Sequence, residues 1–420
     1  RIRISLVIVL LCSSAANAGF LQSFIGSFQE CFHPTPESHA SLAKIRKEFN
    51  LDTVKLRRIT DHMLSEMDAG LSAEGSSSLL MIPTHLTAVP TGRETGSYLA
   101  LDLGGTNFRV LKVTLRGDGT HEVQQSKHRL SEALMAGSGA ALFDYIAEKV
   151  ADMVPEARGG AAATPLGFTF SFPVQQTAID AGRLIKWTKG FSCPGVEGED
   201  VVGLLRDALA RAGVSVKVAA LVNDTPGTLF AGAYKDPAAA AGLILGTGTN
   251  LCYIEKARRI PKMVNRPFHR LPSVATWCIP PYARPQADHI VNTEWGNFDS
   301  CGGASKVLPR TAYDEGVDKL SVNPGSHLYE KMISGMYLGE VVRQAAAELI
   351  ARGELLPALK SSAAHAFSTP GGFGTEVMST VEASKSAAEV QAALGKAGVA
   401  GASAADCRLL QGLCRIVSTR

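Results

Sequence analysis

Apolar and polar residues follow one another in a pattern that predicts both helices and strands. Residues 38–70 carry apolar positions every three or four residues, the spacing of an amphipathic helix. Residues 97–115 (SYLALDLGGTNFRVLKVTL) read as two strands around a Gly-Gly turn, and Asp118-Gly119 is a hairpin signal. Residues 166–174 (LGFTFSFPV) predict a strand that Pro173 ends. The first half of the chain is therefore expected to mix the two kinds of element.

The same alternation continues toward the middle of the chain. Helices are predicted at 141–154 and at 199–213, the second closed by Gly213. Residues 216–224 predict a strand that is apolar on both faces and opens into a helix at 225–234. Residues 241–255 (AGLILGTGTNLCYIE) repeat the strand, glycine turn and strand of the first motif. The pattern is typical of an α/β protein, and its two glycine motifs suggest two related domains across a cleft.

The first 19 residues differ from the rest in composition. They combine a basic start, an apolar run over residues 4–12 and an Ala-x-Ala sequence at 16–18, which are the three parts of a secretory signal peptide. The run is shorter than the ~20 residues of a membrane span, although an uncleaved anchor and a buried element are alternatives. The sequence begins with Arg1, so we expect the natural start to lie upstream.

Composition narrows the function classes. A formal net charge of +3 over 420 residues does not favour a nucleic-acid partner or an acidic membrane surface. The eight cysteines form no C-x-x-C pair, so neither a zinc site nor a disulfide framework is predicted.

Residues 258–287 form a separate segment with six prolines, six Lys or Arg residues and no acid. Its lack of any period predicts an exposed or disordered loop. A basic docking loop is one interpretation; a tolerated surface insertion or a misannotated exon is the interpretation that we favour.

The stretch LDLGGTNFRV (residues 101–110) carries the first candidate chemistry. It lacks the lysine of the nucleotide-binding loop G-x-x-x-x-G-K-[ST] and the spacing of G-x-G-x-x-G. A simple β-turn and a phosphate-binding turn therefore both remain open.

Polar residues in four further stretches suggest a sugar site. A sugar carries many hydroxyls, and buried polar groups must be paired, so carboxylates, amides and a lysine at fixed positions suit it. Candidates of this kind are Ser171, Thr188, Lys189, Asn223, Asp224, Asn250, Glu294 and Glu330. Each has a plainer alternative: Asp224 can be a helix N-cap, Lys189 a solvated charge and Glu330 an exposed helix residue.

Seven stretches in this order, LDLGGTNFRV, FTFSFPV, WTKGF, LVNDT, LGTGTN, VNTEWG and NPG…YEKMISGMYLGE, resemble the hexokinase family. The resemblance covers roughly residues 38–420. It implies the actin-like ATPase (ribonuclease H-like) fold, with a small domain at 38–224 and a large domain at 225–420 around a sugar and ATP cleft. It also implies a kinase that transfers the ATP γ-phosphate to the 6-hydroxyl of glucose, or of fructose or mannose, at the start of glycolysis.

The resemblance also assigns roles to residues. It makes Asp224 the catalytic base and Lys189 the neighbouring cation. The positions that match sugar contacts are Ser171, Phe172, Thr188, Lys189, Asn223, Asp224, Asn250, Glu294 and Glu330. The positions that match ATP contacts are Asp102, Leu103, Gly104, Gly105, Thr106 and Asn107 in the first turn and Thr247 in the second. Asp102 would reach Mg²⁺ through water, and no direct protein ligand to the metal is expected.

Three departures from the family pattern qualify these expectations. The insertion at 258–287 precedes Glu294 and could disturb it. The basic region after SGMYLGE is reduced to Arg343, and STPGGFGTEV matches the ATP-side loop loosely. The second phosphate motif and the adenosine loop are missing, so we expect the sequence to be C-terminally incomplete. A catalytically weak glucose-binding sensor is therefore the alternative function.

The expected location follows from the same two features. The family resemblance implies the cytosol, with the mitochondrial surface reached through the N-terminus. The signal-like segment instead implies secretory or plastid targeting.

Overall fold

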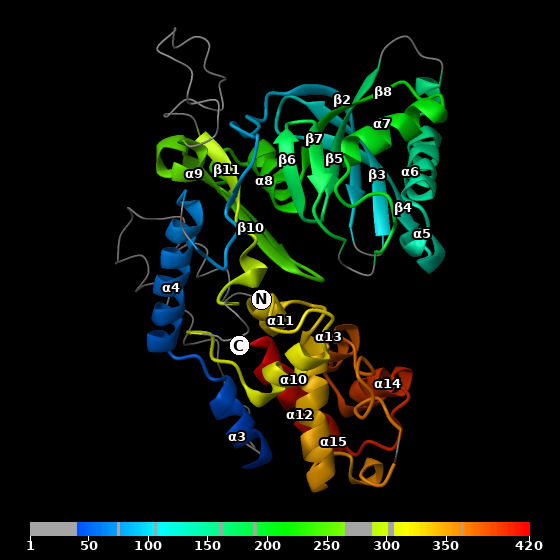
Figure 1. Cartoon of the computed structure of the whole chain (residues 1–420). Helices are drawn as coiled ribbons and strands as arrows, with labels where there is room; N and C mark the ends of the chain where they lie inside the picture. Colours follow the sequence, from blue (N-terminus) through cyan, green and yellow to red (C-terminus); the bar gives the residue numbers. More distant parts are fainter. Residues whose placement is uncertain are drawn as a thin grey trace.

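The structure is a computed structural model that describes residues 40–73, 76–104, 107–158, 163–187, 191–264, 288–300, 306–362 and 364–420. Both strands and helices are abundant, which confirms the predicted α/β class. Figure 1 shows two sheets together in the upper part of the molecule and a group of helices below them.

The first sheet, within the described residues, has the strand order β4-β3-β2-β5-β8. β2 and β3 pair antiparallel around the glycine turn, as predicted, whereas β2, β5 and β8 run parallel. Parallel strands end at the same edge of a sheet, so the residues that follow them converge there. The strands are β2 (Thr95–Leu103), β3 (Asn107–Arg116), β4 (His121–Arg129), β5 (Thr164–Phe170) and β8 (Val216–Val222).

Helices α6 (Gly139–Met153) and α7 (Val201–Arg211) lie side by side against this sheet (Figure 1). They close a core in which Phe108, Phe143 and Phe168 are fully buried. Gly213 ends α7 in the left-handed conformation, as predicted. The short helix α5 (Glu132–Ala136) and the hairpin of β6 (Val174–Ala178) and β7 (Ala181–Leu184) complete this unit.

Strand β8 is an edge strand. Val218 and Leu221 are buried, whereas Lys217 and Ala219 are exposed. The prediction that both faces of this strand are buried is therefore wrong, since part of one face remains exposed.

The second sheet has the order β1-β11-β10-β9, with every pair antiparallel. Its strands are β1 (Ile82–Pro83), β9 (Ala241–Leu245), β10 (Thr249–Lys256) and β11 (Asp288–Asn292). Helix α8 (Asp224–Lys235) packs against β9 and β10. Gly242 permits this close packing, since a Cβ there would lie 2.8 Å from the amide nitrogen of Leu229.

A third unit is helical and surrounds a core that includes Leu349, Leu410 and Leu413. Two of its helices begin with capping boxes, Thr311 with Asp314 and Ser403 with Asp406. Its helices are α10 (Ala312–Leu320), α11 (Leu328–Ile333), α12 (Leu338–Arg352), α13 (Thr375–Ala383), α14 (Ala387–Lys396) and α15 (Ala404–Ser418).

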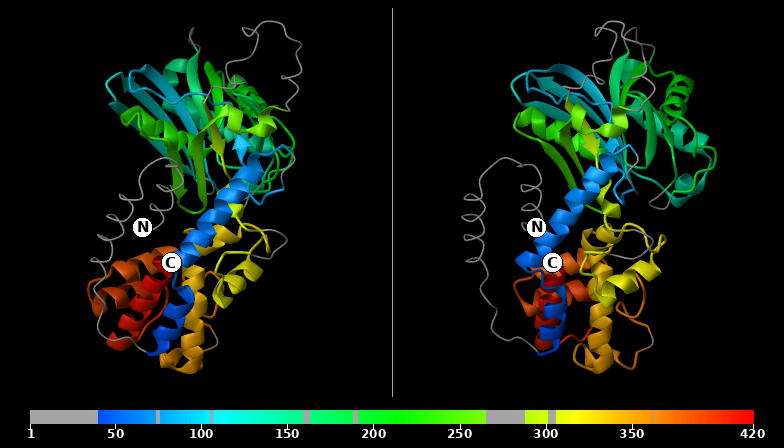
Figure 2. Two further views of the ribbon diagram at one scale, coloured as in Figure 1. Left: turned by 90° about the vertical axis from the view of Figure 1, so that its left-hand side faces the viewer. Right: turned by 60° about the vertical axis from the view of Figure 1, so that its left-hand side comes forward.

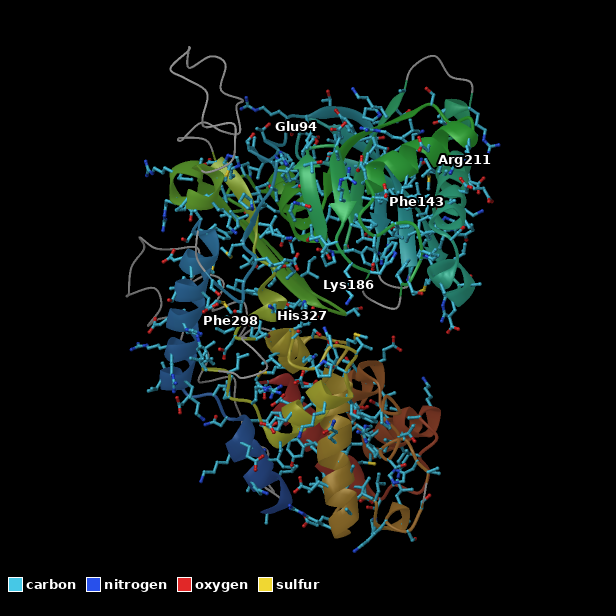
Figure 3. The ribbon with its side chains drawn as sticks, in the orientation of Figure 1. Glu94, Phe143, Lys186, Arg211, Phe298 and His327 are labelled. Atoms are coloured by element: carbon cyan, nitrogen blue, oxygen red, sulfur yellow. The ribbon has the colours of Figure 1, made fainter. Side chains whose placement is uncertain are left out.

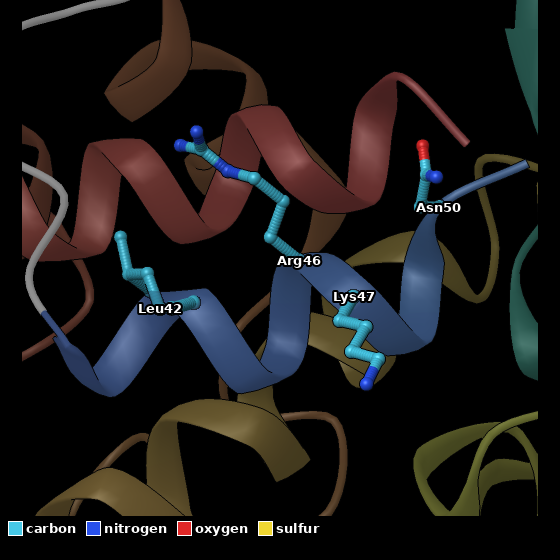
Figure 4. A pocket seen from close by; sticks show the side chains of 5 residues that line it. Leu42, Arg46, Lys47 and Asn50 are labelled. Atoms are coloured by element: carbon cyan, nitrogen blue, oxygen red, sulfur yellow. The ribbon is translucent and has the colours of Figure 1, made fainter.

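The N-terminal helices α3 (Ala40–Phe49) and α4 (Thr53–Leu71) pack with the second half of the chain. α3 lies along α15, beside a hollow of about 380 Å³ lined by Leu42, Ala43, Arg46, Lys47 and Asn50 (Figure 4). In both views of Figure 2, α4 runs in front from the helical unit toward the second sheet, which β1 joins. The expected small domain at 38–224 is thereby corrected: residues 40–83 belong with the larger C-terminal part.

The start of the basic insertion is folded. Residues 257–259 form a 3₁₀ turn, and α9 (Pro261–Val264) follows it. Ile260 and Met263 are buried in the core around Leu251 and Val291, so the expectation of an exposed loop is wrong for these two residues. Arg258, Arg259 and Pro261 are exposed, as expected. Residues 265–287 lie outside the described part of the chain.

Among the helices of the described ranges, none combines the length and apolar character that crossing a bilayer requires. The signal-like residues 1–19 lie outside those ranges.

Two helical glycines test how closely the helical unit is packed. A Cβ on Gly339 in α12 would lie 2.6 Å from the carbonyl oxygen of Phe373, so Gly339→Ala should lower the free energy of unfolding by about 2 kcal/mol. Gly395 in α14 has open space at the same position, so Gly395→Ala should raise it by roughly 0.5–1 kcal/mol. Urea unfolding measures both, and effects of equal sign would contradict the packing described.

Candidate active site

The end of β8 brings an amide and an acid to the edge where the parallel strands end. Asn223 caps helix α8, its Oδ1 accepting from the Thr225 amide at 3.2 Å, and Asp224 is the first residue of the helix. The alternative in which Asp224 is itself the cap is therefore wrong. Asp224 is half-buried at the helix N-terminus, where the peptide dipoles favour a negative charge. Its carboxylate is placed at the strand edge.

Ser171 and Asp102 belong to the same edge of the first sheet. Ser171 directly follows β5, is buried, and donates its amide hydrogen to the Leu103 carbonyl at 3.2 Å. Asp102 lies in β2 opposite Arg109, whose guanidinium is 2.8 Å from the carboxylate. The predicted residues from β2, β5 and β8 thus meet at one edge, as the parallel order requires.

The second sheet contributes an amide and carboxylate network. Asn250 in β10 donates through Nδ2 to Oδ1 of Asn292 at 2.9 Å and to Oε1 of Glu294 at 3.2 Å. Asn292 at the end of β11 donates to the same Glu294 oxygen at 2.7 Å. Oδ1 of Asn223 lies 3.4 Å from Nδ2 of Asn250, which joins the network to the start of α8. The structure therefore brings Asn223, Asn250 and Glu294 together, as predicted.

Glu330 in α11 reaches the turn between β9 and β10. Its Oε2 accepts from the Thr249 amide at 3.0 Å. Two glycines make room for it: a Cβ on Gly248 would lie 2.5 Å from that oxygen, and a Cβ on Gly296 would lie 3.2 Å from the Glu330 Cβ. Gly296 is two residues from Glu294, so the two predicted glutamates belong to one neighbourhood.

Glu294 has a left-handed backbone with φ 52°. A non-glycine residue in this region costs of order 1–3 kcal/mol and is retained where the surroundings over-determine it, as is common at functional sites. The buried indole of Trp295, whose Nε1 donates to Thr249 Oγ1 at 3.0 Å, fixes the turn that follows Glu294. Residues 265–287 of the insertion lie outside the described residues, so the expected disturbance of Glu294 by the insertion stays a prediction.

An aromatic cluster adjoins the remaining sugar-site candidates. Phe172 packs against Trp187 and Phe191 with ring centroids 4.9 Å and 5.0 Å apart. Phe172 as a whole is buried. Thr188 and Lys189 lie between Trp187 and Phe191 in the sequence but outside the described residues.

The two glycine turns differ in how much of them is described. In the first, Leu103 is buried and Gly104 follows it, Gly105 and Thr106 lie outside the described residues, and Asn107 begins β3. In the second, the carbonyls of Gly246 and Thr247 accept from the amides of Gly335 and Met336 at 2.8 and 3.0 Å, while Thr247 stays exposed. Each turn follows a strand directly, which suits a close backbone approach to phosphate oxygens.

Arg343 does not supply a free cation to this region. Its guanidinium is buried, forms two hydrogen bonds with Glu340 at 2.6 and 2.7 Å, and donates to the Phe367 carbonyl. Burial raises the pKa of Glu340, but the hydrogen bonds from Arg343 and the Gly371 amide outweigh it, and the net pKa is lowered. The pair therefore fastens α12 to residues 367–371.

The buried thiol of Cys252 lies near Asp224 and is not a reactive nucleophile. Burial raises the pKa of Cys252 to about 12, and the nearby Asp224 charge acts in the same direction. A protonated thiol is a poor nucleophile, so covalent catalysis by this cysteine is not supported.

The sequence reasoning missed Asn292. It is buried and donates a hydrogen bond of 2.7 Å to Glu294, shorter than the 3.2 Å bond from Asn250. Its signal in the sequence was its place two residues before Glu294, close enough along the chain for the two side chains to meet.

Comparison with known proteins places this site in a family. Two hexokinase family models match residues 41–234 and 240–420. Hexokinase-1 of Oryza sativa subsp. japonica is 44% identical over 330 residues, which are 76% of this chain and 62% of that protein. Hexokinase-like 1 protein of Arabidopsis thaliana is 43% identical over 311 residues, 72% and 58% of the two chains. The chain thus spans about three fifths of the length of these relatives.

A solved structure agrees with the sequence matches. The hexokinase from Schistosoma mansoni, complexed with glucose, superposes with a TM-score of 0.76 at 37% identity, covering 89% of this chain and 80% of that one. The expected actin-like ATPase fold is confirmed by this likeness. From both comparisons, the chain belongs to the hexokinase family.

Proposed function

We propose that this protein is a hexokinase that transfers the γ-phosphoryl group of ATP to the 6-hydroxyl of glucose or a related hexose. The observation that carries the proposal is the joining of Asn223, Asn250 and Glu294 beside Asp224 at the edge where the parallel strands end. The relative from Schistosoma mansoni was solved with glucose, which supports a hexose as the acceptor.

Asp224 is the proposed base. Phosphoryl transfer depends on positioning and charge stabilisation, and the attacking hydroxyl must lose a proton to a nearby acceptor. Asp224 is a half-buried carboxylate at a helix N-terminus, where the peptide dipoles favour a negative charge, which suits this role. Lys189 is proposed as the neighbouring cation in the sugar site.

Hexose recognition is assigned to the amides and glutamates. A hexose hydroxyl both donates and accepts, so it pairs with an amide on one side and a carboxylate on the other. Asn250 and Asn292 hold one oxygen of Glu294, and the Thr249 amide holds one oxygen of Glu330. These bonds fix the direction of each carboxylate. Ser171, Thr188 and the backbone of Phe172 are proposed to close the site from the first sheet.

The residues present fit a Mg²⁺–nucleotide complex held mostly through its phosphates. Mg²⁺ favours one or two carboxylates together with phosphate oxygens, and it neutralises charge on the transferred group when bound. Asp102 offers a single carboxylate at a strand end, next to the first glycine turn. No group of three or more His, Cys, Asp or Glu residues in the described ranges could hold a metal by itself. Residues 102–107 and Thr247 are accordingly proposed to meet the ATP phosphates.

The substitution Asp224→Ala tests the proposed base. Turnover should fall by about 10²–10⁴-fold because the hydroxyl proton loses its acceptor, while hexose binding persists through the remaining polar groups. A coupled assay with glucose and Mg-ATP measures turnover, and calorimetry measures glucose binding. The matched control is Asp236→Ala at the exposed C-terminal end of the same helix, which should keep turnover within twofold.

The same coupled assay and calorimetry on the unsubstituted chain distinguish the kinase from the glucose sensor. Product formation supports the kinase. Glucose binding without product formation would favour the catalytically weak sensor, and undiminished turnover by the Asp224→Ala variant would refute the base.

The pair Asn292→Asp and Asn292→Ala tests the network that holds Glu294. Either change should lower the free energy of unfolding by about 2 kcal/mol at pH 8, because a buried hydrogen bond is lost. An aspartate would put two carboxylates in contact and raise the pKa of one of them. Since the protonated form restores a donor, the loss should shrink as the pH falls toward 5 for Asn292→Asp and stay constant for Asn292→Ala. Urea unfolding at both pH values measures this, and a pH-independent loss in the aspartate variant would count against the contact.

A further inference from the structure

Asn297 lies between Glu294 and Glu330 in the sequence, and its side chain forms hydrogen bonds to two different segments. It ends the 3₁₀ turn Trp295–Asn297 that follows Glu294. Its Nδ2 donates to the Ser78 carbonyl at 2.9 Å, and its Oδ1 accepts from the His327 amide at 2.9 Å. One side chain therefore ties the Glu294 turn to the start of α11.

The Ser78 side of this bridge is anchored in helix α4. Oε2 of the buried Glu66 accepts from the Ser78 amide at 2.8 Å and from the Ser78 hydroxyl at 2.9 Å. Burial raises the pKa of Glu66, but the hydrogen bonds from Ser78 and Ser77 outweigh it and the net pKa is lowered. The Ser78 hydroxyl in turn accepts from the Asp299 amide at 3.0 Å. Asn297 is thus bonded to a Ser78 backbone that Glu66 of α4 holds in place.

The second hydrogen bond of the Asn297 side chain is to His327, the residue that precedes α11. His327 precedes the helix with a left-handed backbone, φ 53°, and its carbonyl accepts from the Lys331 amide. Ser300 Oγ accepts from the next amide, Leu328, at 2.9 Å. Figure 3 labels His327 and Phe298, the residue that follows Asn297, in the region below β10. Glu330 is three residues after His327, the N-cap of the same short helix, so the position of the His327 backbone contributes to the position of Glu330, together with the Thr249 amide.

We infer that Asn297 is a positioning residue for hexose binding: it holds Glu330 against the Glu294 turn, and the affinity for the hexose depends on it. The inference rests on the proposed function. It assigns no contact with the hexose to Asn297, because both of its bonds are to the backbone of neighbouring segments.

The test is Asn297→Ala in the full chain, with glucose as the probe. The glucose Kd should rise about tenfold, because Glu330 loses its fixed position, while the KM for ATP stays within twofold. Asn297→Asp keeps an acceptor for the His327 amide and should leave the glucose Kd within about threefold of the parent. Calorimetry gives the Kd, the coupled assay gives the KM, and thermal unfolding confirms that each variant is folded.

Asn323→Ala is the matched control. Asn323 lies next to the same histidine, with Nδ2 3.4 Å from the His327 ring, but it does not hold the His327 backbone. Its glucose Kd should stay within twofold of the parent. An unchanged glucose Kd in folded Asn297→Ala, or equal changes in the glucose Kd and the ATP KM, overturns the inference. If the parent itself binds no hexose, the proposed function fails first and the inference falls with it.

Discussion

The pairing of one buried amide, that of Asn250, is the interaction on which the site depends. Its nitrogen has two hydrogens and faces three oxygens: those of Asn292 and Glu294, at and just after the end of β11, and that of Asn223 at the start of α8. Because an unpaired polar group costs free energy in a buried setting, β10, β11 and the start of α8 must keep their relative positions. A strand pairing that shifted by one residue would break all of these bonds at once.

A second constraint fixes the two sheets relative to each other. The hydroxyl of Tyr234, near the end of α8, donates to the Glu94 carbonyl and accepts from the Gly117 amide, both at 3.1 Å. Thr84, just after β1, donates its amide to the Ile290 carbonyl at 2.9 Å. The chain crosses between the units near these contacts, so the strand edge with Asp224 is held beside the second sheet. Strained backbones at Glu294 and His327 persist inside this frame because neighbouring groups satisfy them.

Much of the fold followed from local pattern. Amphipathic spacing predicted α6 and α7, Gly213 marked the end of α7, and the two glycine turns marked their hairpins, because each feature depends on residues close in sequence. The predicted bounds of the small domain were wrong because they depend on contacts between residues that are far apart in the sequence. In the sequence, residues 40–83 directly precede the first sheet and were therefore assigned to its domain. In the structure, the apolar side chains of α3 pack against α15 and those of α4 pack against the second sheet. Ile260 and Met263 are also buried by residues far away in the sequence, although the basic, proline-rich composition around them predicted exposure.

By itself, the sequence determined which residue types the site contains and their order along the chain, since seven motifs carry them. The tertiary structure alone decided which of them touch. Asn250 came to join Asn223 to Asn292, Glu330 reached the Thr249 amide, and Asn297 came to join Ser78 to His327. The physical reason is that hydrogen bonds act over about 3 Å between segments that lie tens of residues apart, and local pattern carries no information on such distances.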